Sequence, residues 1–292
     1  MQIANNTVGA VAGFYRRELS ALYSDSELQQ IVRWALQKQL NDRKNSFADP
    51  AARIHESDLT QLERMCYELK AHKPLQYVLG EAEFYGMTFL VNAQVLIPRP
   101  ETEELVEKIL KEMAPDAFVL DIGTGSGCIP VSIKKNKPAS RVMAIDISEG
   151  ALDVAKNNAR LHGADVDFRK MDILDEGAPA RLLDAHARQL FDVVVSNPPY
   201  VLDAEKESLA ERVRDFEPQL ALFVSNSDPI FFYRKIAAAG LALLKPGGRL
   251  WFECHKDFAG QVQQMLLAHT YKDVTLHPDL SGLPRMVAAT RI

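Results

Sequence analysis

Four consecutive residues, Asn197-Pro198-Pro199-Tyr200, bring together groups that could hold a flat NH2 group. They follow the apolar, β-branched run 191–196, which is typical of a strand buried on both faces. Because proline cannot donate a hydrogen bond to a sheet ladder, this strand must end at Asn197. The Asn197 amide oxygen and the Pro198 carbonyl could each accept one N–H, and Tyr200 could stack on the plane of the group. We therefore predict that all four residues bind substrate and that Asn197, Pro198 and Tyr200 are catalytic; a simple turn is the alternative for a Pro-Pro pair.

A glycine-rich loop, Gly123-Thr124-Gly125-Ser126-Gly127, directly follows another predicted strand, 118–122, and opens a helix. Its glycines would let the backbone approach a ligand closely. Asp146 ends the next strand, where a carboxylate can accept both hydroxyls of a ribose. Asp172, at the end of the third strand, could accept from the exocyclic amine of adenine, with Ile173 packing on the ring. A solvated loop acid is the alternative interpretation of Asp172.

Two cofactor classes are compatible with such a loop. A dinucleotide fingerprint requires G-x-G-x-x-G, but the spacing here is G-x-G-x-G, and Cys128 stands where the third dinucleotide glycine belongs. Asp121, just before the loop, would repel a pyrophosphate and attract a positively charged group. An adenosyl cofactor with a positive charge and no phosphate, such as S-adenosylmethionine, therefore fits better than a nicotinamide dinucleotide. The predicted cofactor-binding residues are Asp121, Gly123, Thr124, Gly125, Ser126, Gly127, Asp146, Asp172, Ile173 and Asn197.

From residue 118 onward the apolar pattern alternates between strands and helices. Strands are predicted at 118–122, 141–147, 166–168, 191–196, 249–253, 273–276 and 286–290. Helices are predicted between them at 128–135, 151–162, 230–244 and 258–269. This alternation predicts an α/β fold with a doubly wound, largely parallel sheet that a final antiparallel pair completes. Ligands bind such sheets at the carboxyl ends of the strands, which is where the glycine loop and Asn197 lie.

The chain before residue 101 has a different character. Residues 1–80 have apolar residues at helical spacing, which predicts a small helical bundle that holds or selects a partner. A purely structural appendage is the alternative for this bundle. Residues 81–100 predict a β-hairpin linker, with one strand over 84–91, a turn at Asn92-Ala93 and a second strand at 95–97. The remaining residues, 101–292, would form the catalytic domain.

The composition of the 292 residues is that of an ordinary soluble globular protein, with 47% hydrophobic and 25% charged residues. A net charge of −5 gives no global basic footprint for duplex nucleic acid. Cys66, Cys128 and Cys254 are far apart and form neither a metal-binding spacing nor a disulfide framework, so we expect no metal. Scattered cysteines fit a reducing compartment, and no signal peptide or membrane span is evident. We therefore expect a cytoplasmic protein without a membrane partner.

The chain also resembles a known family. Its most telling stretches are PLQYVLGEAEFYG, VLIPRPETEELVE, LDIGTGSGCI, AIDIS, SNPPY, EPQLAL, FFYRKI, LKPGG and DLSGLPRMVAA. Together they resemble the release-factor glutamine methyltransferases, the PrmC/HemK family, from about Pro74 to the C-terminus. The first eighty residues are similar only in forming a short helical domain. The resemblance implies a helical substrate-recognition domain at the N-terminus, followed in the sequence by a seven-stranded Rossmann-like methyltransferase sheet.

The resemblance further implies methyl transfer from S-adenosylmethionine to the side-chain amide nitrogen of the glutamine in the Gly-Gly-Gln motif of peptide-chain release factors. It implies a protein substrate, no direct nucleic-acid partner and a monomer. The chain departs from the family pattern at Ser225–Pro229 and at Cys254–Phe258, which puts details of the substrate groove in doubt. The alternatives are an amino-methyltransferase acting on a flipped adenine or guanine, and an inactive cofactor-binding module.

Overall fold

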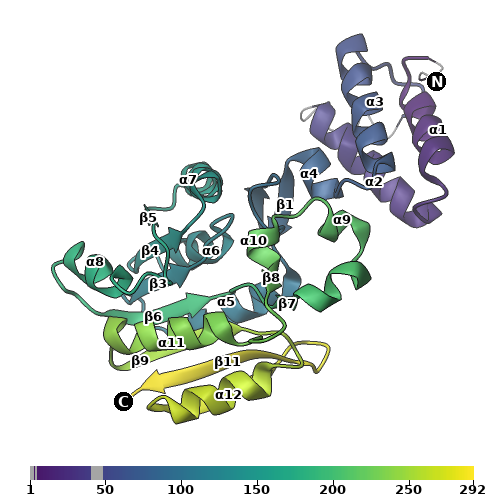
Figure 1. The fold of residues 1–292 in the computed structure, drawn as a ribbon. Coiled ribbons are helices and arrows are strands. Elements are labelled where there is room, and N and C mark those ends of the chain that lie inside the picture. The colour runs from purple at the N-terminus through teal and green to yellow at the C-terminus, as the bar shows by residue number, and fades with distance from the viewer. Residues whose placement is uncertain (1–2, 4, 41–48) are drawn as a thin grey trace. The chain divides into compact units, whose positions relative to one another are not determined.

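The computed structural model describes residues 3, 5–40 and 49–292. The chain divides into two compact units, one made of Met1–Glu81 with Ala210–Phe216, the other of Ala82–Leu209 with Glu217–Ile292. The first unit contains the helices α1 (Val8–Leu19), α2 (Asp25–Gln39), α3 (Glu56–Lys70), α4 (Leu75–Leu79) and α9 (Glu211–Arg214) (Figure 1). The predicted limits of three domains, 1–80, 81–100 and 101–292, stay a prediction.

Helix α2 in the first unit illustrates how the sequence sets a helix boundary. The Ser24 hydroxyl oxygen accepts a hydrogen bond from the Glu27 N–H, and the Glu27 carboxylate accepts one from the Ser24 N–H, which is a complete capping box. The apolar faces of α1, α2 and α3 then pack into one core that includes the fully buried Phe14, Tyr15 and Leu62. The predicted helical bundle is therefore present in the described part of residues 1–80.

The hairpin differs from its prediction. Its strands are β1 (Glu81–Phe84) and β2 (Met87–Leu90), so the turn falls at Tyr85-Gly86 instead of Asn92-Ala93. Both turn residues have positive φ, 51° and 71°, as a tight two-residue hairpin turn requires. Tyr85 tolerates this conformation because its N–H donates to Glu103 and its hydroxyl to Glu107. The predicted second strand at 95–97 is wrong, and its physical reason lies in the site described below.

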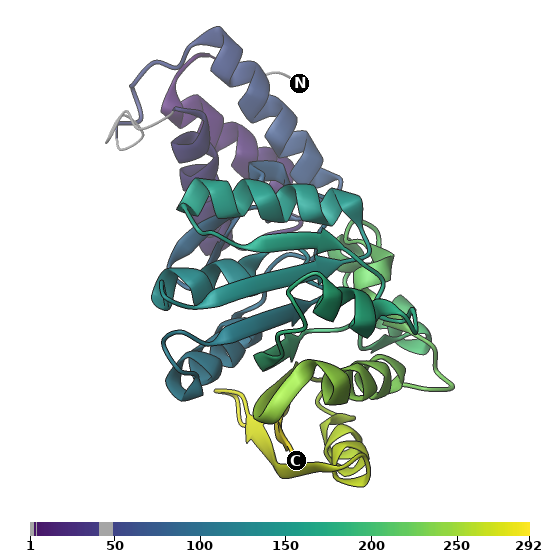
Figure 2. The ribbon, with the colours of Figure 1, turned by 90° about the vertical axis from the view of Figure 1, so that its left-hand side faces the viewer.

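The second unit is built on a seven-stranded sheet in the order β10-β11-β9-β6-β3-β4-β5. The strands are β3 (Phe118–Ile122), β4 (Arg141–Asp146), β5 (Asp167–Lys170), β6 (Phe191–Ser196), β9 (Leu244–Glu253), β10 (Tyr271–Pro278) and β11 (Pro284–Arg291). All neighbouring pairs from β9 to β5 are parallel, whereas β11 runs antiparallel to both β9 and β10. In Figure 2 the yellow C-terminal segment lies at one edge of the row of teal strands. The predicted doubly wound sheet with a final antiparallel pair is confirmed.

Helices cover both faces of this sheet. The helices of the second unit are α5 (Pro100–Glu112), α6 (Cys128–Asn136), α7 (Glu149–His162), α8 (Ala178–Asp184), α10 (Gln219–Leu222), α11 (Phe231–Leu243) and α12 (Ala259–Ala268). Helices α5, α6 and α7 share one core with the sheet, and α8, α11 and α12 share the other. Figure 1 shows α11 along β9 and α12 beside β11. Because both faces are covered, the central strands are mostly apolar, as their sequence indicated, with Asp121 as a buried exception in β3.

The connection between β6 and α11 contains short elements that the sequence did not predict. They are β7 (Val201–Leu202), a 3-10 helix at Asp203–Ser208, and β8 (Phe223–Val224), which pairs in parallel with β7. None of the helices in the described residues is long and apolar enough to cross a bilayer.

Candidate active site

The sheet places the glycine loop and Asn197 next to each other. Strand β3 lies between β4 and β6: the chain passes from β3 to β4 and β5 on one side and then returns to the other side of β3 as β6. The crevice between β3 and β6 is therefore the topological switch point of the sheet, where ligands bind in such folds. Ile122 pairs with Ser196, and the Ser196 hydroxyl donates to the Ile122 carbonyl at 2.7 Å. The residues that follow, Gly123 and Asn197, therefore emerge side by side at the carboxyl ends of the two strands.

A cavity of about 420 Å³ opens at this edge. Its lining includes ten of the predicted site residues, namely Gly123, Thr124, Gly125, Ser126, Asp146, Asp172, Ile173, Asn197, Pro198 and Pro199. Asp121, Gly127 and Tyr200 are outside this lining: Asp121 belongs to β3, Gly127 is the last loop residue before α6, and Tyr200 contacts Glu253. The structure thus brings segments from four strand ends to one cavity of a size suited to a small cofactor.

The glycine loop is held by backbone interactions on both sides. The N–H groups of Gly123 and Thr124 donate to the Ile145 carbonyl at 2.9 and 3.0 Å. Gly127 has a φ of 79°, and a Cβ on it would lie 3.0 Å from the Cβ of Ala155 in α7. The loop therefore packs against α7 so closely that this position requires glycine.

Asn158, which the sequence analysis missed, ties the loop to the hairpin. It is fully buried on α7, and its side-chain nitrogen donates to the carbonyls of Ser126 at 2.8 Å and Leu90 at 3.0 Å. Its amide oxygen accepts from the Leu90 N–H at 2.7 Å. A polar residue among the apolar positions of the predicted helix 151–162 was the signal that could have identified it.

Asp146 and Asp172 lie on the far side of the loop. The two Asp146 oxygens accept from the N–H groups of Gly125 and Ser148, each at 2.9 Å. Burial raises the pKa of Asp146, and these backbone N–H groups partly offset the increase. Because a carboxylate oxygen has more than one acceptor position, Asp146 retains capacity for ribose hydroxyls. Asp172 accepts from the Leu174 N–H at 2.8 Å, and the half-buried Ile173 packs on the adjoining core.

The surroundings of Asp121 show whether this site suits a cationic cofactor. Asp121 is completely buried, and neither carboxylate oxygen has a hydrogen-bond partner among the described residues. Burial raises its pKa to about 7, and the negative charge of Asp146 adds to this rise. An unpartnered buried acid is costly, and a nearby positive charge would remove that cost. The residues present therefore fit S-adenosylmethionine, whose charge is positive, better than a pyrophosphate cofactor.

Asn197 is anchored from behind by residues that the sequence analysis did not select. Its side-chain nitrogen donates to the Thr102 hydroxyl at 3.3 Å, and that hydroxyl donates to a Glu253 oxygen at 2.6 Å. The β6–β9 register explains the contact, because Ser196 pairs with Phe252 and the next residues, Asn197 and Glu253, come out together. A carboxylate at the end of the apolar strand RLWFE was the sequence signal for Glu253.

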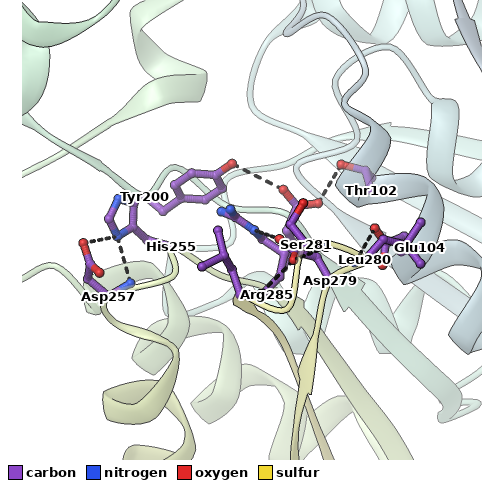
Figure 3. A network of polar contacts seen from close by, with 11 residues as sticks. Thr102, Glu104, Tyr200, His255, Asp257, Asp279, Leu280, Ser281 and Arg285 are labelled. Carbon is purple, nitrogen blue, oxygen red and sulfur yellow. Dashed lines mark hydrogen bonds and ion pairs between the residues drawn. The ribbon is translucent and has the colours of Figure 1, made fainter.

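Tyr200 meets the same carboxylate. Its hydroxyl donates to the other Glu253 oxygen at 3.3 Å, and Figure 3 shows the contacts of Thr102 and Tyr200 converging from opposite sides. Burial raises the pKa of Glu253 to about 7, an effect that the Thr102 hydrogen bond and the Arg285 charge reduce. Burial likewise raises the pKa of the Tyr200 hydroxyl. In this structure Tyr200 therefore supports the site through Glu253, whereas its predicted stacking on a substrate stays a prediction.

Arg99 lines the cavity and is held by the buried Glu217. An Arg99 guanidinium nitrogen lies 2.6 Å from a Glu217 oxygen, and the Ile97 N–H donates to the second oxygen at 3.2 Å. Glu217 is buried and Arg99 lines the cavity. This is why 95–97 is not a strand: the Ile97 N–H is used by a carboxylate instead of a sheet ladder. Arg99 is paired, in contrast to a freely solvated arginine.

The two stretches that depart from the family pattern lie outside the residues that line this cavity. Ser225 and Ser227 contact each other through their hydroxyls, 2.9 Å apart, in an exposed turn. His255 is mostly buried, with its ring 6.0 Å from that of Tyr200 (Figure 3) and its Nε2 3.5 Å from Glu205. The cavity itself is therefore unaffected by these departures.

Comparison with known proteins identifies the family. The family described as "Methyltransferase small domain" matches residues 100–215. A release factor glutamine methyltransferase from Bacteroides thetaiotaomicron is 44% identical over 231 residues, which are 79% of this chain and 81% of that protein. Another, from Flavobacterium psychrophilum, is 39% identical over 276 residues, or 92% and 94% of the two chains.

A solved methyltransferase structure from Pyrococcus furiosus shares the fold. Its TM-score is 0.52 at 14% identity, over 81% of this chain and 99% of that chain. At this identity the similarity concerns the fold alone, whereas the relatives above are similar in sequence over most of their length. The chain therefore belongs to the release factor glutamine methyltransferase family.

Proposed function

We propose that this protein transfers a methyl group from S-adenosylmethionine to the side-chain amide nitrogen of the glutamine in the Gly-Gly-Gln motif of peptide-chain release factors. It is an enzyme, and its class, an S-adenosylmethionine-dependent methyltransferase, follows from its family. The observation that carries the proposal is that the Asn197-Pro198 acceptors and the glycine loop line one cavity. A cofactor and an amide substrate can therefore meet there.

The cofactor side of the cavity is formed by the glycine loop with Asp121, Asp146, Asp172 and Ile173. When bound, S-adenosylmethionine supplies an electrophilic methyl group. Asp146 would accept from the ribose hydroxyls, and Asp172 with Ile173 would recognise the adenine. Asp121 would balance the positive charge, for which its unpartnered oxygens are suited.

The substrate side has to overcome the low nucleophilicity of an amide nitrogen, whose lone pair is delocalised into the carbonyl. Asn197 and the Pro198 carbonyl would each accept one N–H of the substrate amide, which orients the nitrogen and favours positive charge on it. Orientation of this kind can lower a barrier by about 7 kcal/mol, and preorganised acceptors stabilise the developing charge. The proposal needs no general base before the methyl group moves, because the nitrogen can lose its proton afterwards.

The remaining features of the proposal concern partners and location. We assign recognition of the release factor to the helical N-terminal unit, which has no catalytic constellation among its described residues. We infer a cytoplasmic monomer without a direct nucleic-acid partner. The net charge of −5 and the three buried free cysteines support these inferences.

The test is a transfer assay with labelled S-adenosylmethionine. The substrates are a purified release factor, the same factor with Gln→Ala in its Gly-Gly-Gln motif, and bulk RNA and DNA. Label on the intact factor alone is the expected result. Label on nucleic acid with an unlabelled release factor would mean that the Asn197 acceptors bind a flipped base, and the proposal would be wrong.

A further inference from the structure

A continuous chain of hydrogen bonds connects the candidate active site to a buried acid. It runs from the Asn197 side-chain nitrogen to the Thr102 hydroxyl, at 3.3 Å, and from that hydroxyl to Glu253, at 2.6 Å. Thr102 and Glu253 are only 3% and 1% exposed, so water does not compete for these contacts. Figure 3 shows Thr102 directed at this carboxylate.

The hydrogen-bonding capacities of Glu253, Thr102 and Asn197 determine which group donates and which accepts at each step. An ionised carboxylate can only accept, so the single hydrogen of the Thr102 hydroxyl is committed to Glu253. The Thr102 oxygen can then only accept from Asn197, which must present its NH2 group to it. The Asn197 oxygen is thereby left for the other side, where the cavity lies. The two ends of an asparagine amide have nearly the same shape, so packing alone does not choose between the two orientations.

We propose that Glu253 is a positioning residue that acts through Thr102 to keep the Asn197 oxygen, and not its NH2 group, available to the substrate amide. This inference rests on the proposed function, because it assigns Asn197 the role of acceptor. Glu253 touches no substrate in this scheme. Its effect reaches the reaction only through the orientation of one amide.

The orientation of Asn197 depends on whether Glu253 is ionised, and the neighbours of Glu253 influence this. Besides Thr102 and Tyr200, the groups that act on its charge are Arg285, which favours ionisation, and Glu101, which opposes it. The Tyr233 hydroxyl donates to the Glu253 carbonyl at 3.2 Å. Burial raises the pKa of the Glu253 carboxyl to about 7. A protonated Glu253 can donate to Thr102, which then donates to the Asn197 oxygen, and the whole chain reverses.

Matched variants of Thr102 separate the hydroxyl from its bulk. Thr102→Val keeps the shape and removes the hydrogen bonds, whereas Thr102→Ser keeps the hydroxyl. We expect Thr102→Val to lower kcat about 10- to 100-fold, which is less than the roughly 100- to 1,000-fold lost with a preorganised group that contacts the reacting atoms itself. Although Thr102 lines the cavity, we assign it no contact with either ligand, so the KM for the release factor and the Kd for S-adenosylmethionine should stay within about twofold. Thr102→Ser should restore most of kcat.

Glu253→Gln tests the carboxylate itself. Thr102 and Tyr200 both donate to Glu253, and a glutamine has only one oxygen to accept from them. We expect kcat to fall and its dependence on pH to change: in the wild type kcat rises as Glu253 ionises, and in Glu253→Gln this rise disappears. The control is Thr290→Val, which removes another buried hydroxyl, bonded to Arg249 and outside the cavity. It should leave the pH profile of kcat unchanged.

Nuclear magnetic resonance supplies a readout that needs neither substrate nor turnover. The Asn197 side-chain NH2 signals, assigned by their loss in Asn197→Asp, should shift in Thr102→Val and stay near their wild-type positions in Thr102→Ser. Thermal unfolding of each variant shows whether it is folded. If Thr102→Val is unfolded, the comparison is made between Thr102→Ser and the wild type. Wild-type kcat, pH profile and NH2 signals in both Thr102→Val and Glu253→Gln would overturn the inference. A wild-type enzyme without transfer to any release factor would instead contradict the proposed function, while the NH2 signals would still test the orientation.

Discussion

The hydroxyl of Thr102 and the carboxylate of Glu253 are 2.6 Å apart although 151 positions separate them in the sequence. Thr102 lies in the first turn of α5 and Glu253 ends β9, so the packing of α5 on the sheet sets this contact. The polar support of the site is therefore a product of tertiary structure, and its consequences for Asn197 can be tested by substitution.

The first prediction concerns Asn197. Replacing it with alanine removes an acceptor for the substrate amide but leaves the glycine loop and Asp146 in place. We expect kcat to fall at least about 100-fold, as for the loss of one oxyanion-hole donor, with a nearly unchanged Kd for S-adenosylmethionine. Transfer kinetics and calorimetric titration measure the two quantities. Full activity of Asn197→Ala would contradict the proposed mechanism.

The second prediction concerns the pH dependence of stability at Asp121. Burial raises its pKa in the folded protein to about 7, from an ordinary value of 3.8. The folded state therefore binds the proton more tightly than the unfolded state, and stability falls as pH rises from about 4 to about 7. The shift of roughly three units corresponds to at most about 4 kcal/mol. Asp121→Asn should remove this loss and unfold at a higher temperature than the wild type at pH 8.

The same substitution should weaken cofactor binding. A bound cation favours ionised Asp121, so the affinity of the wild type for S-adenosylmethionine should increase as pH rises through about 7. In Asp121→Asn the affinity should be lower and nearly independent of pH in this window. Titrations at several pH values measure both effects. If Asp121→Asn is stabilised but binds S-adenosylmethionine as tightly as the wild type, Asp121 does not contribute to cofactor binding.

The third prediction concerns Gly127. Alanine at this position would suffer from both a positive φ and a Cβ 3.0 Å from that of Ala155. Gly163→Ala is the matched control, because it has a φ of 59° and no atom within 4 Å of the added Cβ. We expect Gly127→Ala to cost more unfolding free energy than Gly163→Ala, by about 1–3 kcal/mol for the steric overlap. Equal losses in urea titrations would show that φ alone accounts for the effect.

The fourth prediction concerns the ion pair of Arg99 and Glu217. Arg99→Gln leaves the Glu217 carboxylate buried and without its ion-pair partner, although the Ile97 N–H still donates to it, and we expect the unfolding free energy to fall by about 1–3 kcal/mol. Arg188→Gln is the control, since its pair with Asp184 is exposed and should contribute less than about 1 kcal/mol. Denaturant titration compares the two variants. Cofactor affinity should also fall for Arg99→Gln, because the segment around Ile97 lines the cavity.

The regular part of the fold could be predicted because apolar periodicity reports burial directly. Strand β3 was predicted with its exact limits, 118–122, and β6 likewise. Predictions were wrong where a side chain replaces a regular backbone partner. The Ile97 N–H is taken by Glu217, 120 positions away, and no local pattern could indicate this. The turn at Tyr85-Gly86 was missed because Tyr85 adopts positive φ only with the support of Glu103 and Glu107.

The candidate site divides in the same way. The residues at strand ends could be predicted, because strand order and carboxyl ends follow from the alternation of elements, and most of them line the cavity. The supporting residues Thr102, Asn158 and Glu253 could not, because their importance depends on which helix packs next to which strand. Their side chains are among the buried polar groups of the unit, and burial of that kind is not visible in sequence alone.

The position of β11 has a consequence for how the protein folds. It follows β10 in the chain but lies between β10 and β9, and its Met286 pairs with Glu253. Strand β10 therefore cannot join the sheet before β11 does, and the two are expected to form a hairpin that docks on β9 as one piece. This docking brings Met286 next to Glu253, so it also covers the end of β9. The acid that orients Asn197 would be held in place only once the hairpin has docked, so a chain that has formed its glycine loop but not this hairpin would still lack the support of Asn197.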